Sequence, residues 1–381
     1  MNKTLLPGSA IGVMGGGQLG RMFAIAARRM GYRVEVFTPE EESPAGQFAD
    51  LTRIADYNNE SAVRKFAEDV DVITFEFENI PAQTAEWCAE HRDVRPAGGI
   101  LHIAQHRLRE KTWLSESGFP VAPFKAVHSS NELANAIEQI GRPAILKTAA
   151  WGYDGKGQQT INTRDDWEEI WSSASADEMV VESSIAFQAE ISVIVARGVD
   201  GTMTTFPACE NIHKNHILDV TVVPARVDPA VQENAAELAR AIAEKLDLVG
   251  LLAVEMFVKP DGELLVNELA PRPHNSGHWT IEACATSQFE QHVRAICGLP
   301  LGSTEILMPA AMANILGNVW QQGEPHWAQA LGNAGVHLHL YGKSEPRPRR
   351  KMGHLTAVGK TPEEAIARVT KARTDLAPAT K

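Results

Sequence analysis

The chain has 381 residues, of which 44% are hydrophobic and 22% charged, so it is long enough for two or three domains with full cores. Its formal net charge of -12 argues against a general nucleic-acid binder, which needs excess positive charge to neutralise phosphates. No apolar run approaches the ~18 residues of a membrane span, and the four cysteines form no CxxC pair. We therefore expect a soluble protein of the reducing cytoplasm.

The N-terminal segment predicts a βαβ unit with a glycine-rich first turn. A buried strand over 10–14 precedes the turn 15–20, and an apolar-faced helix and a second strand follow. The turn matches the G-x-G-x-x-G dinucleotide fingerprint, but the second strand ends at Phe37 without the acidic residue that binds a ribose 2′-hydroxyl. A tight turn, an NAD site and a small-substrate site at the helix N-terminus all stay open.

The rest of the chain alternates helices and strands in a less regular order. A strand over 70–75 completes a doubly wound α/β domain, and the last helix opens with the capping-box residues Thr361 and Glu364. Between them we expect helices over 106–118, 130–140 (capped by Ser130) and 229–246, and strands over 144–147, 159–161, 178–182, 189–197, 251–258, 263–269 and 336–341.

A lysine on a short strand precedes a second glycine-rich segment. Lys147 is followed by 152–158, which lacks the GK[ST] of a P-loop. Flexible backbone can close over a triphosphate while a strand lysine reaches the phosphates, as in protein kinases. The segment thus indicates either a nucleotide-covering hairpin or an ordinary surface hairpin.

Two glutamates lie on the two strands of one predicted hairpin. If Val258 faces Glu263, then Glu255 faces Val266 and Glu268 is its diagonal neighbour, ~7–8 Å away on the same face. Their neighbours are apolar, and two buried carboxylates are unfavourable unless a cation pairs them. We predict a magnesium ion that bridges nucleotide phosphates; solvated strand-edge glutamates are the alternative.

Two further segments carry anion-binding side chains. Arg272, His274 and Asn275 follow the hairpin directly and are donors suited to an oxyanion, although a proline-ordered surface loop would look similar. The basic stretch 347–351 is either a solvated charge run or a phosphate site.

Together these segments resemble the ATP-grasp superfamily and, within it, the N5-carboxyaminoimidazole ribonucleotide synthetase family. The segments that carry the resemblance are GGGQLGRM (15–22), TFEFENI (74–80), KTAAWGYDGKGQ (147–158), VVES (180–183), EISVIVAR (190–197), ENIHKN (210–215), VEMFV (254–258), NELAPRPHNSGHW (267–279) and RRKMGHL (349–355). The implied fold is α/β and α+β. It comprises a Rossmann-like domain similar to the biotin carboxylase N-terminal domain (1–105), an ATP-grasp domain (106–300, lid about 120–188) and a small β-rich domain (301–381).

The resemblance also implies roles for individual residues. ATP would be bound by Arg107, Lys147, Gly152, Tyr153, Asp154, Gly155, Lys156, Gly157, Gln158, Glu182, Ser183, Ser184, Ile185, Glu190, His213, Asn267 and Glu268. Aminoimidazole ribonucleotide and bicarbonate would contact Gln18, Leu19, Glu76, Tyr153, Asp154, Arg272, His274, Asn275, Lys343, Arg350 and Lys351. Magnesium would lie on Glu255 and Glu268, and the catalytic residues would be Lys147, Asp154, Arg272 and His274.

The implied reaction is carboxylation of aminoimidazole ribonucleotide in purine biosynthesis by a cytoplasmic homodimer. ATP and bicarbonate would give carboxyphosphate, and Asp154 could accept the amine proton. The nearest alternative is a formate-dependent glycinamide ribonucleotide transformylase, against which Gln18 and Asn275 argue. A nucleotide sensor and an NAD oxidoreductase are the alternatives from other classes. Arg349 departs from the family pattern, because a glycine commonly occupies its place, so either Arg349 or Arg350 could meet the substrate phosphate.

Overall fold

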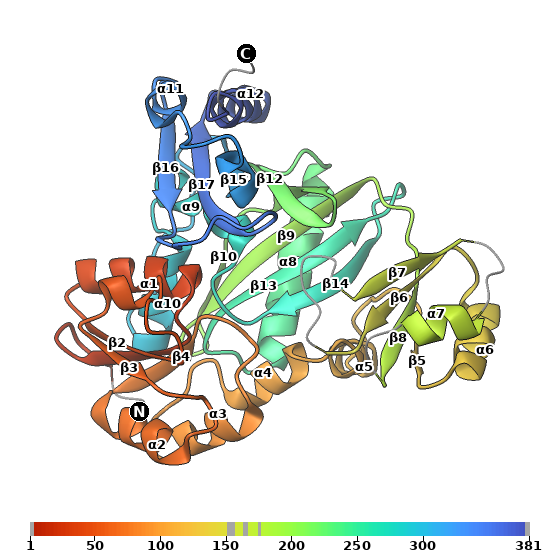
Figure 1. Ribbon diagram of the computed structural model, residues 1–381, viewed down its shortest axis with the longest axis horizontal. Coiled ribbons are helices and arrows are strands. Elements are labelled where there is room, and N and C mark those ends of the chain that lie inside the picture. The colour runs from red at the N-terminus through yellow and green to blue at the C-terminus, as the bar shows by residue number, and fades with distance from the viewer. Residues whose placement is uncertain (1–3, 151–156, 163–166, 174–176, 378–381) are drawn as a thin grey trace.

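The computed structural model describes residues 4–150, 157–162, 167–173 and 177–377. Figure 1 shows a long central sheet with three groups of elements around it: the N-terminal α/β lobe at the lower left, a lid at the right and the C-terminal strands and helices at the top. In the described part of the chain, none of the helices combines the length and apolar character that a membrane span requires.

The N-terminal lobe is a parallel sheet of order β3-β2-β1-β4 with helices on its faces, which confirms the predicted α/β lobe. Its elements are β1 (Ala10–Met14), α1 (Gln18–Arg29), β2 (Arg33–Thr38), the short η1 (Gly46–Phe48), β3 (Leu51–Ile54), α2 (Glu60–Asp69), β4 (Val72–Phe75), α3 (Ala82–Ala89) and α4 (Gly98–Ala104). Helix α1 begins inside the glycine-rich turn, three residues earlier than its apolar pattern suggested.

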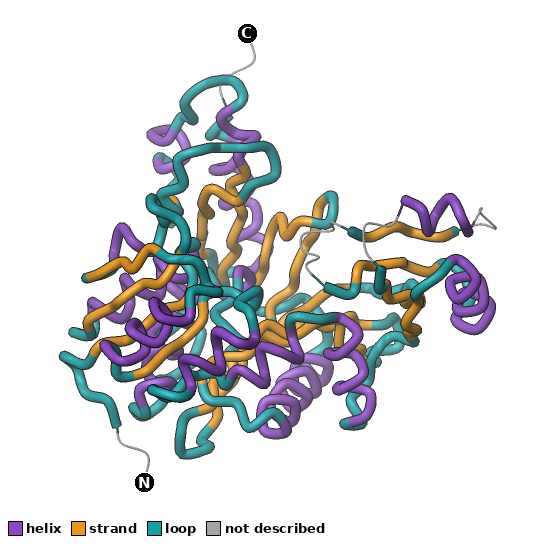
Figure 2. The backbone as a smooth tube through the Cα atoms, turned by 60° about the horizontal axis from the view of Figure 1, so that its bottom comes forward, coloured by secondary structure: helices purple, strands orange, loops and turns teal. Residues whose placement is uncertain are grey.

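The lid is a separate antiparallel sheet of order β5-β8-β6-β7, and Figure 2 shows its helices at the outer edge of the molecule. Its elements are β5 (Phe124–Val127), α6 (Ser130–Ile140), β6 (Ala144–Thr148), β7 (Gln158–Ile161), α7 (Trp167–Ser173) and β8 (Met179–Ser183); α5 (Arg107–Glu116) leads into it. The cap of α6 is Ser129, whose Oγ accepts from the Glu132 N–H at 3.2 Å, so the prediction of Ser130 was wrong by one residue.

The central sheet has the order β14-β13-β9-β11-β12-β15-β17-β16, with β10 paired to β9. Because β12 pairs with β15, the C-terminal strands extend this sheet. The remaining elements are β9 (Ala189–Arg197), β10 (Met203–Thr205), β11 (Cys209–Lys214), β12 (Ile217–Val223), α8 (Pro229–Lys245), β13 (Gly250–Val258), β14 (Leu264–Ala270), η2 (Asn275–Gly277), α9 (Thr280–Ala283), α10 (Gln288–Cys297), β15 (Ala310–Leu316), η3 (Gly317–Trp320), α11 (Trp327–Leu331), β16 (Val336–Leu340), β17 (Lys351–Val358) and α12 (Pro362–Thr374).

Helices attach the lobes to this sheet. Helix α10 contacts α1 as well as β9 and β13, whereas α12 contacts β15 and β17. The α12 capping box is confirmed: Thr361 Oγ1 accepts from the Glu364 N–H at 3.2 Å, and the Glu364 carboxylate accepts from the Lys360 N–H at 2.7 Å. Helix α10 therefore joins the N-terminal lobe to the central sheet, and α12 packs on the C-terminal strands.

The β13–β14 hairpin differs from its predicted register. Lys259 N–H donates to the Glu263 carbonyl at 2.9 Å, so Glu263 closes the turn and Val258 pairs with Leu264. A bulge then shifts the ladder by one more residue, and Glu255 pairs directly with Glu268. The predicted diagonal was wrong, and the two carboxylates are closer neighbours than expected.

Candidate active site

The glycine-rich turn at the start of α1 closes on a carboxylate from the loop after β4. Glu76 Oε1 accepts from the Gly17 N–H at 2.8 Å, and its Oε2 accepts from the Gly20 N–H at 3.2 Å. A Cβ on Gly17 would lie 2.5 Å from Glu76, which explains the glycine there. Because this carboxylate already occupies the helix N-terminus, the turn does not fit a dinucleotide pyrophosphate. Burial raises the pKa of Glu76, and the two N–H donors oppose the rise.

The two other residues assigned to this turn have different surroundings. Gln18 is half-buried, whereas the Leu19 side chain packs into the hydrophobic core of the N-terminal lobe. Any contact of Leu19 with a substrate is therefore left to its backbone.

The loop after β14 is tied to the N-terminal lobe by an ion pair. Arg272 Nη2 lies 3.0 Å from Glu78 Oε1. Burial would raise the pKa of Glu78, but the charge and hydrogen bond of Arg272, together with the charge of Arg107, outweigh burial and lower that pKa. The neighbouring Asn275 is 9% exposed, and among the described residues nothing contacts its amide oxygen or nitrogen through a hydrogen bond. A buried amide without a partner is suited to a polar ligand.

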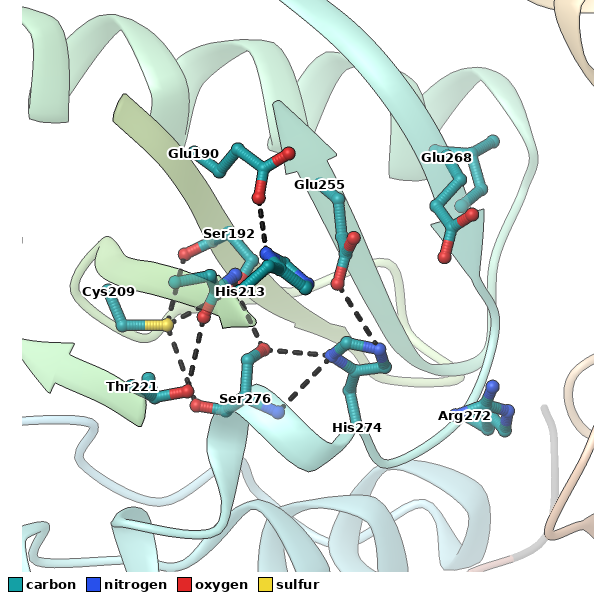
Figure 3. A network of polar contacts seen from close by, with 12 residues as sticks. Glu190, Ser192, Cys209, His213, Thr221, Glu255, Glu268, Arg272, His274 and Ser276 are labelled. Atoms are coloured by element: carbon teal, nitrogen blue, oxygen red, sulfur yellow. Dashed lines mark hydrogen bonds and ion pairs between the residues drawn. The ribbon is translucent and has the colours of Figure 1, made fainter. Parts of the chain in front are cut away.

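The paired carboxylates of Glu255 and Glu268 face the same part of the site as Arg272 and His274 (Figure 3). The pKa of Glu255 is raised to about 8, first by burial and then by the charge of Glu268, while His213 and Lys351 oppose the rise. Arg107 Nη1 lies 3.5 Å from Glu268 Oε2. In the described ranges there is no group of three or more His, Cys, Asp or Glu side chains placed for a metal. Two carboxylates and the oxygens of a nucleotide are nevertheless the usual set for Mg²⁺, and a cation would relieve this repulsion.

A second buried charge cluster lies between α5 and the lid. Glu182 Oε2 accepts from Lys147 Nζ at 3.0 Å and from Lys111 Nζ at 3.2 Å. All three side chains are at most 10% exposed, and together they carry one net positive charge. Burial lowers the pKa of Lys147, and Glu182 opposes that shift. The cluster is therefore a fixed cation beside the strand that leads to the glycine-rich loop.

Sequence reasoning missed Lys111, Glu110 and Glu78. Lys111 follows Arg107 by four residues on α5, and this spacing places both on one helix face, which could have indicated it. Glu110 Oε2 accepts from the Leu269 N–H at 3.1 Å, and its pKa is raised to about 8 by burial and then by Glu268. Glu78 lies in the same acidic loop as Glu76, but no sequence pattern identifies its partner.

The other residues that the resemblance assigns to ATP lie at the end of β8, in the connection that follows it, and on the central strands β9 and β11. Ser183 ends β8, Ser184 and Ile185 begin the connection to β9, and Ser184 N–H donates to the Pro143 carbonyl at 3.0 Å. Glu190 on β9 pairs with His213 on β11 (Figure 3). Burial would lower the pKa of His213, but the hydrogen bond and charge of Glu190, together with the charge of Glu255, outweigh burial and raise that pKa.

The glycine-rich loop is described only at its end. Gly157 has a φ of +70°, and Gln158 begins β7. Asn267 lies at the bulge of β14, between Val266 and Glu268, each of which pairs with a residue of β13. The Lys111 ammonium donates to the Asn267 carbonyl at 3.5 Å. The other loop residues, Gly152, Tyr153, Asp154, Gly155 and Lys156, lie outside the described residues.

The C-terminal basic residues approach the site from β16 and β17. Lys343 Nζ donates to the Lys351 carbonyl at 2.8 Å. Burial lowers the pKa of Lys343 to about 8, the Arg350 charge adds to that shift, and Glu76 opposes it. Arg349 instead donates to the Asn215 carbonyl at 3.1 Å and has a φ of +68°, a conformation that favours glycine. Arg350 is thus the arginine that lies near Lys343.

Comparison with known proteins identifies the family. The Ribonucleotide synthetase preATP-grasp domain matches 9–105, the ATP-grasp domain matches 112–289, and the Phosphoribosylaminoimidazole carboxylase C-terminal domain matches 310–368. The chain is 47% identical over 371 residues to the N5-carboxyaminoimidazole ribonucleotide synthase of Bacillus subtilis (strain 168), with 97% of each chain covered. The chain belongs to the N5-carboxyaminoimidazole ribonucleotide synthase family.

Solved structures of this family have the same fold. A synthetase in an ADP complex superposes with a TM-score of 0.93 at 43% identity, covering 98% of both chains. The Aspergillus clavatus synthase, solved with ADP and 5-aminoimidazole ribonucleotide, gives 0.90 at 32% identity and covers 98% of this chain and 99% of that one. The expected ATP-grasp fold, with its N-terminal and C-terminal partner domains, is confirmed.

Proposed function

We propose that this chain uses ATP and bicarbonate to carboxylate the exocyclic amine of 5-aminoimidazole ribonucleotide. One observation supports this best: two cationic groups flank the carboxylate pair. Lys147 and Lys111 lie toward the lid. Lys351, on the C-terminal strand β17, is close enough for its charge to lower the pKa of Glu255. One group suits a triphosphate and the other the phosphate of a ribonucleotide. The N5-carboxyaminoimidazole ribonucleotide synthase relatives and their ADP complexes support the same assignment.

On the nucleotide side, Lys147 and Arg107 would contact the phosphates, and the loop 152–158 would cover them. Glu182 to Ile185 would contact adenine, while Glu190 would bind the ribose and His213 would line the site beside it. This proposal is supported by the positions of the strands: β9 and β11 are neighbours in the central sheet and carry the paired Glu190 and His213, and β8 belongs to the lid sheet. Lys147 and Glu182 neutralise each other, so Lys111 gives the three-residue cluster its net positive charge.

Glu255 and Glu268, with Asn267 beside them, would hold Mg²⁺. The ion would neutralise charge on the phosphoryl oxygens during transfer. The direct pairing of the two carboxylates across the hairpin supports this assignment.

On the ribonucleotide side, Lys343, Arg350 and Lys351 would contact the substrate phosphate. Gln18, Leu19 and Glu76 would contact the rest of the ribonucleotide. Arg272, His274 and Asn275 would bind bicarbonate and the reacting groups, and the Asn275 amide, which no described residue contacts through a hydrogen bond, supports this. Tyr153 and Asp154 would complete the site, with Asp154 as the acceptor of the amine proton.

The reaction balances in two steps. A bicarbonate oxygen attacks the γ-phosphorus of ATP, the bond to ADP breaks, and carboxyphosphate forms. Carboxyphosphate then releases phosphate and CO2, which the amine captures with loss of one proton. Lys147 and Arg272 would stabilise the anionic groups in a site from which the lid excludes water.

The same proposal includes the division into 1–105, 106–300 and 301–381, the lid at about 120–188, a homodimer and a cytoplasmic location. The matched domain ranges support the division. The cysteines Cys88, Cys209, Cys284 and Cys297 are all free and buried, which suits a reducing compartment. The family resemblance supports the dimer.

The test is ADP release by purified protein with ATP, bicarbonate and aminoimidazole ribonucleotide, each omitted in turn, together with transfer of labelled bicarbonate into an acid-labile product. ADP release that needs both co-substrates is expected. Release that instead needs formate and glycinamide ribonucleotide would support the transformylase alternative. ATP hydrolysis indifferent to every co-substrate would contradict the proposal.

A further inference from the structure

His274 lies at the end of a row of buried polar side chains that crosses the central sheet (Figure 3). Ser276 is in η2, next to His274, and Ser192, Asn211 and Thr221 lie on β9, β11 and β12. All four are at most 5% exposed. Buried polar groups of this kind have few alternative partners, so the direction of each hydrogen bond is constrained.

The row has a defined polarity. Thr221 Oγ1 donates to Asn211 Oδ1 at 3.2 Å, and Asn211 Nδ2 donates to Ser192 Oγ at 3.0 Å. Ser192 in turn donates to Ser276 Oγ at 2.7 Å. The Ser276 hydroxyl proton is then left for its other neighbour, the Nδ1 atom of His274, at 2.8 Å.

A second donor meets the same ring nitrogen. The backbone N–H of Ser276 is directed at His274 Nδ1 at 3.4 Å, as a cap of η2. A backbone N–H can only donate, and a neutral imidazole carries its proton on one nitrogen. Nδ1 must therefore be the acceptor. The other nitrogen, Nε2, points into the site and lies 3.4 Å from Glu255 Oε1.

We propose that Ser276, Ser192 and Asn211 are positioning residues that hold His274 as the tautomer with its proton on Nε2. His274 then presents an N–H donor to the centre of the site. Resting on the proposed function, its task is to donate a hydrogen bond to an anionic oxygen of bicarbonate or carboxyphosphate. It is not the base that removes the amine proton, because its only lone pair is occupied by Ser276.

The first test reads the tautomer in the unmodified protein and uses a variant only to assign signals. Protein labelled with ¹⁵N-histidine, free of nucleotide and metal, is examined by NMR, and the His274 signals are identified by their loss in His274→Asn. We expect a protonated Nε2 and an unprotonated Nδ1. A protonated Nδ1 in the unmodified protein would overturn the proposal whatever the enzyme's activity.

The second test removes the donors. In Ser276→Ala we expect both tautomers and about a tenfold fall in kcat, the size of one lost hydrogen bond. Ser192→Ala should change the tautomer population and kcat in the same direction but to a smaller extent. The KM for ATP should stay constant in both serine variants. The matched control is Cys209→Ala, which removes a sulfur that hydrogen-bonds with Ser192 Oγ at 3.2 Å but leaves the hydroxyl and amide groups of the row in place.

The outcomes are separable. If the tautomer and kcat stay at wild-type values in both serine variants, the positioning role is wrong. If Cys209→Ala changes them equally, packing rather than hydrogen-bond direction controls the ring. If the protein carboxylates no aminoimidazole ribonucleotide but shows the Nε2 proton, the proposed function fails and the tautomer assignment stands.

Discussion

Glu255 and Glu268 lie directly opposite each other across the β13–β14 hairpin, because the bulge between Glu255 and Met256 brings them into register. Neighbouring side chains at such positions are ~4.5–5.5 Å apart at Cβ, so the backbone itself holds two carboxyl groups together. The Glu255 side chain is 15% exposed and the Glu268 side chain 41% exposed, so water screens the two carboxyl groups only in part. This arrangement is unfavourable for the protein alone and favourable around a divalent cation.

We therefore expect Glu268→Gln to keep the fold and lose turnover. The substitution preserves shape but halves the negative charge available to a cation, so ADP production should fall at least about 100-fold, equivalent to ~2.7 kcal/mol of barrier. Glu263→Gln, on the same hairpin but exposed beside Lys259, is the control and should retain activity. Wild-type turnover of Glu268→Gln at saturating magnesium would exclude the metal assignment.

Short-range features of this chain could be predicted from its sequence, whereas the pairings of distant residues could not. The glycine turn, the Thr361 capping box and the Lys259–Gly262 turn follow from short-range chemistry and were predictable. The hairpin register was not, because a single bulge shifts every following pair and periodicity does not reveal it.

The contacts that complete the site join residues far apart in the chain. Lys111 and Glu182 meet across 71 positions, and Ser192 meets Ser276 across 84. No pattern of polarity within one element carries that information. The resemblance to a family supplied the residues that we propose contact ligands, whereas the residues that hold those side chains in place needed the structure.

The buried Lys111 provides a test of the charge balance at the nucleotide site. In Lys111→Met, Glu182 would neutralise Lys147 alone, so the cluster would lose its net positive charge. We expect the KM for ATP to rise by about 10- to 100-fold and the protein to become less stable, since one partner of a buried ion pair is removed. Lys111→Arg keeps the charge and should recover part of the affinity. An unchanged KM for ATP in Lys111→Met would show that the cluster is only structural.

Three buried histidines predict loss of stability in mild acid. Burial lowers the pKa of His292 to about 3, and burial with neighbouring charges holds the pKa of His278 and His354 well below the usual value. In the unfolded chain each titrates near ~6.5, so below that pH the unfolded state binds more protons and folding stability falls. Each histidine should contribute ~1.4 kcal/mol per pH unit in this window, down to about pH 3 for His292.

Urea unfolding at several pH values between neutrality and mild acid measures this slope. His292→Gln should reduce it by ~1.4 kcal/mol per pH unit, because one titrating group is removed. Thr74 Oγ1 lies 2.8 Å from His292 Nε2, and the glutamine amide can meet the same hydroxyl. A slope identical to wild type would mean that His292 takes up its proton in the folded state.

The two arginines before β17 should differ in their effect on the ribonucleotide. The Arg350 charge contributes to lowering the pKa of Lys343 to about 8, so the two cations lie close together, whereas Arg349 turns to the Asn215 carbonyl. Arg350→Ala should raise the KM for aminoimidazole ribonucleotide by about 10- to 100-fold, the loss of one charge-assisted hydrogen bond. Arg349→Gly should leave that KM unchanged, and the left-handed backbone there accepts glycine without strain.

The pH dependence gives an independent check on Arg350. The substrate phosphate is doubly charged above about pH 6, and Lys343 is charged below about pH 8. Ribonucleotide binding should therefore be tightest between these values and weaken above the upper one. Removing the neighbouring Arg350 charge raises the pKa of Lys343, so in Arg350→Ala the alkaline limb of kcat/KM should move to higher pH even though binding is weaker overall. A limb that moves instead in Arg349→Gly would show that Arg349 is the arginine beside the substrate phosphate.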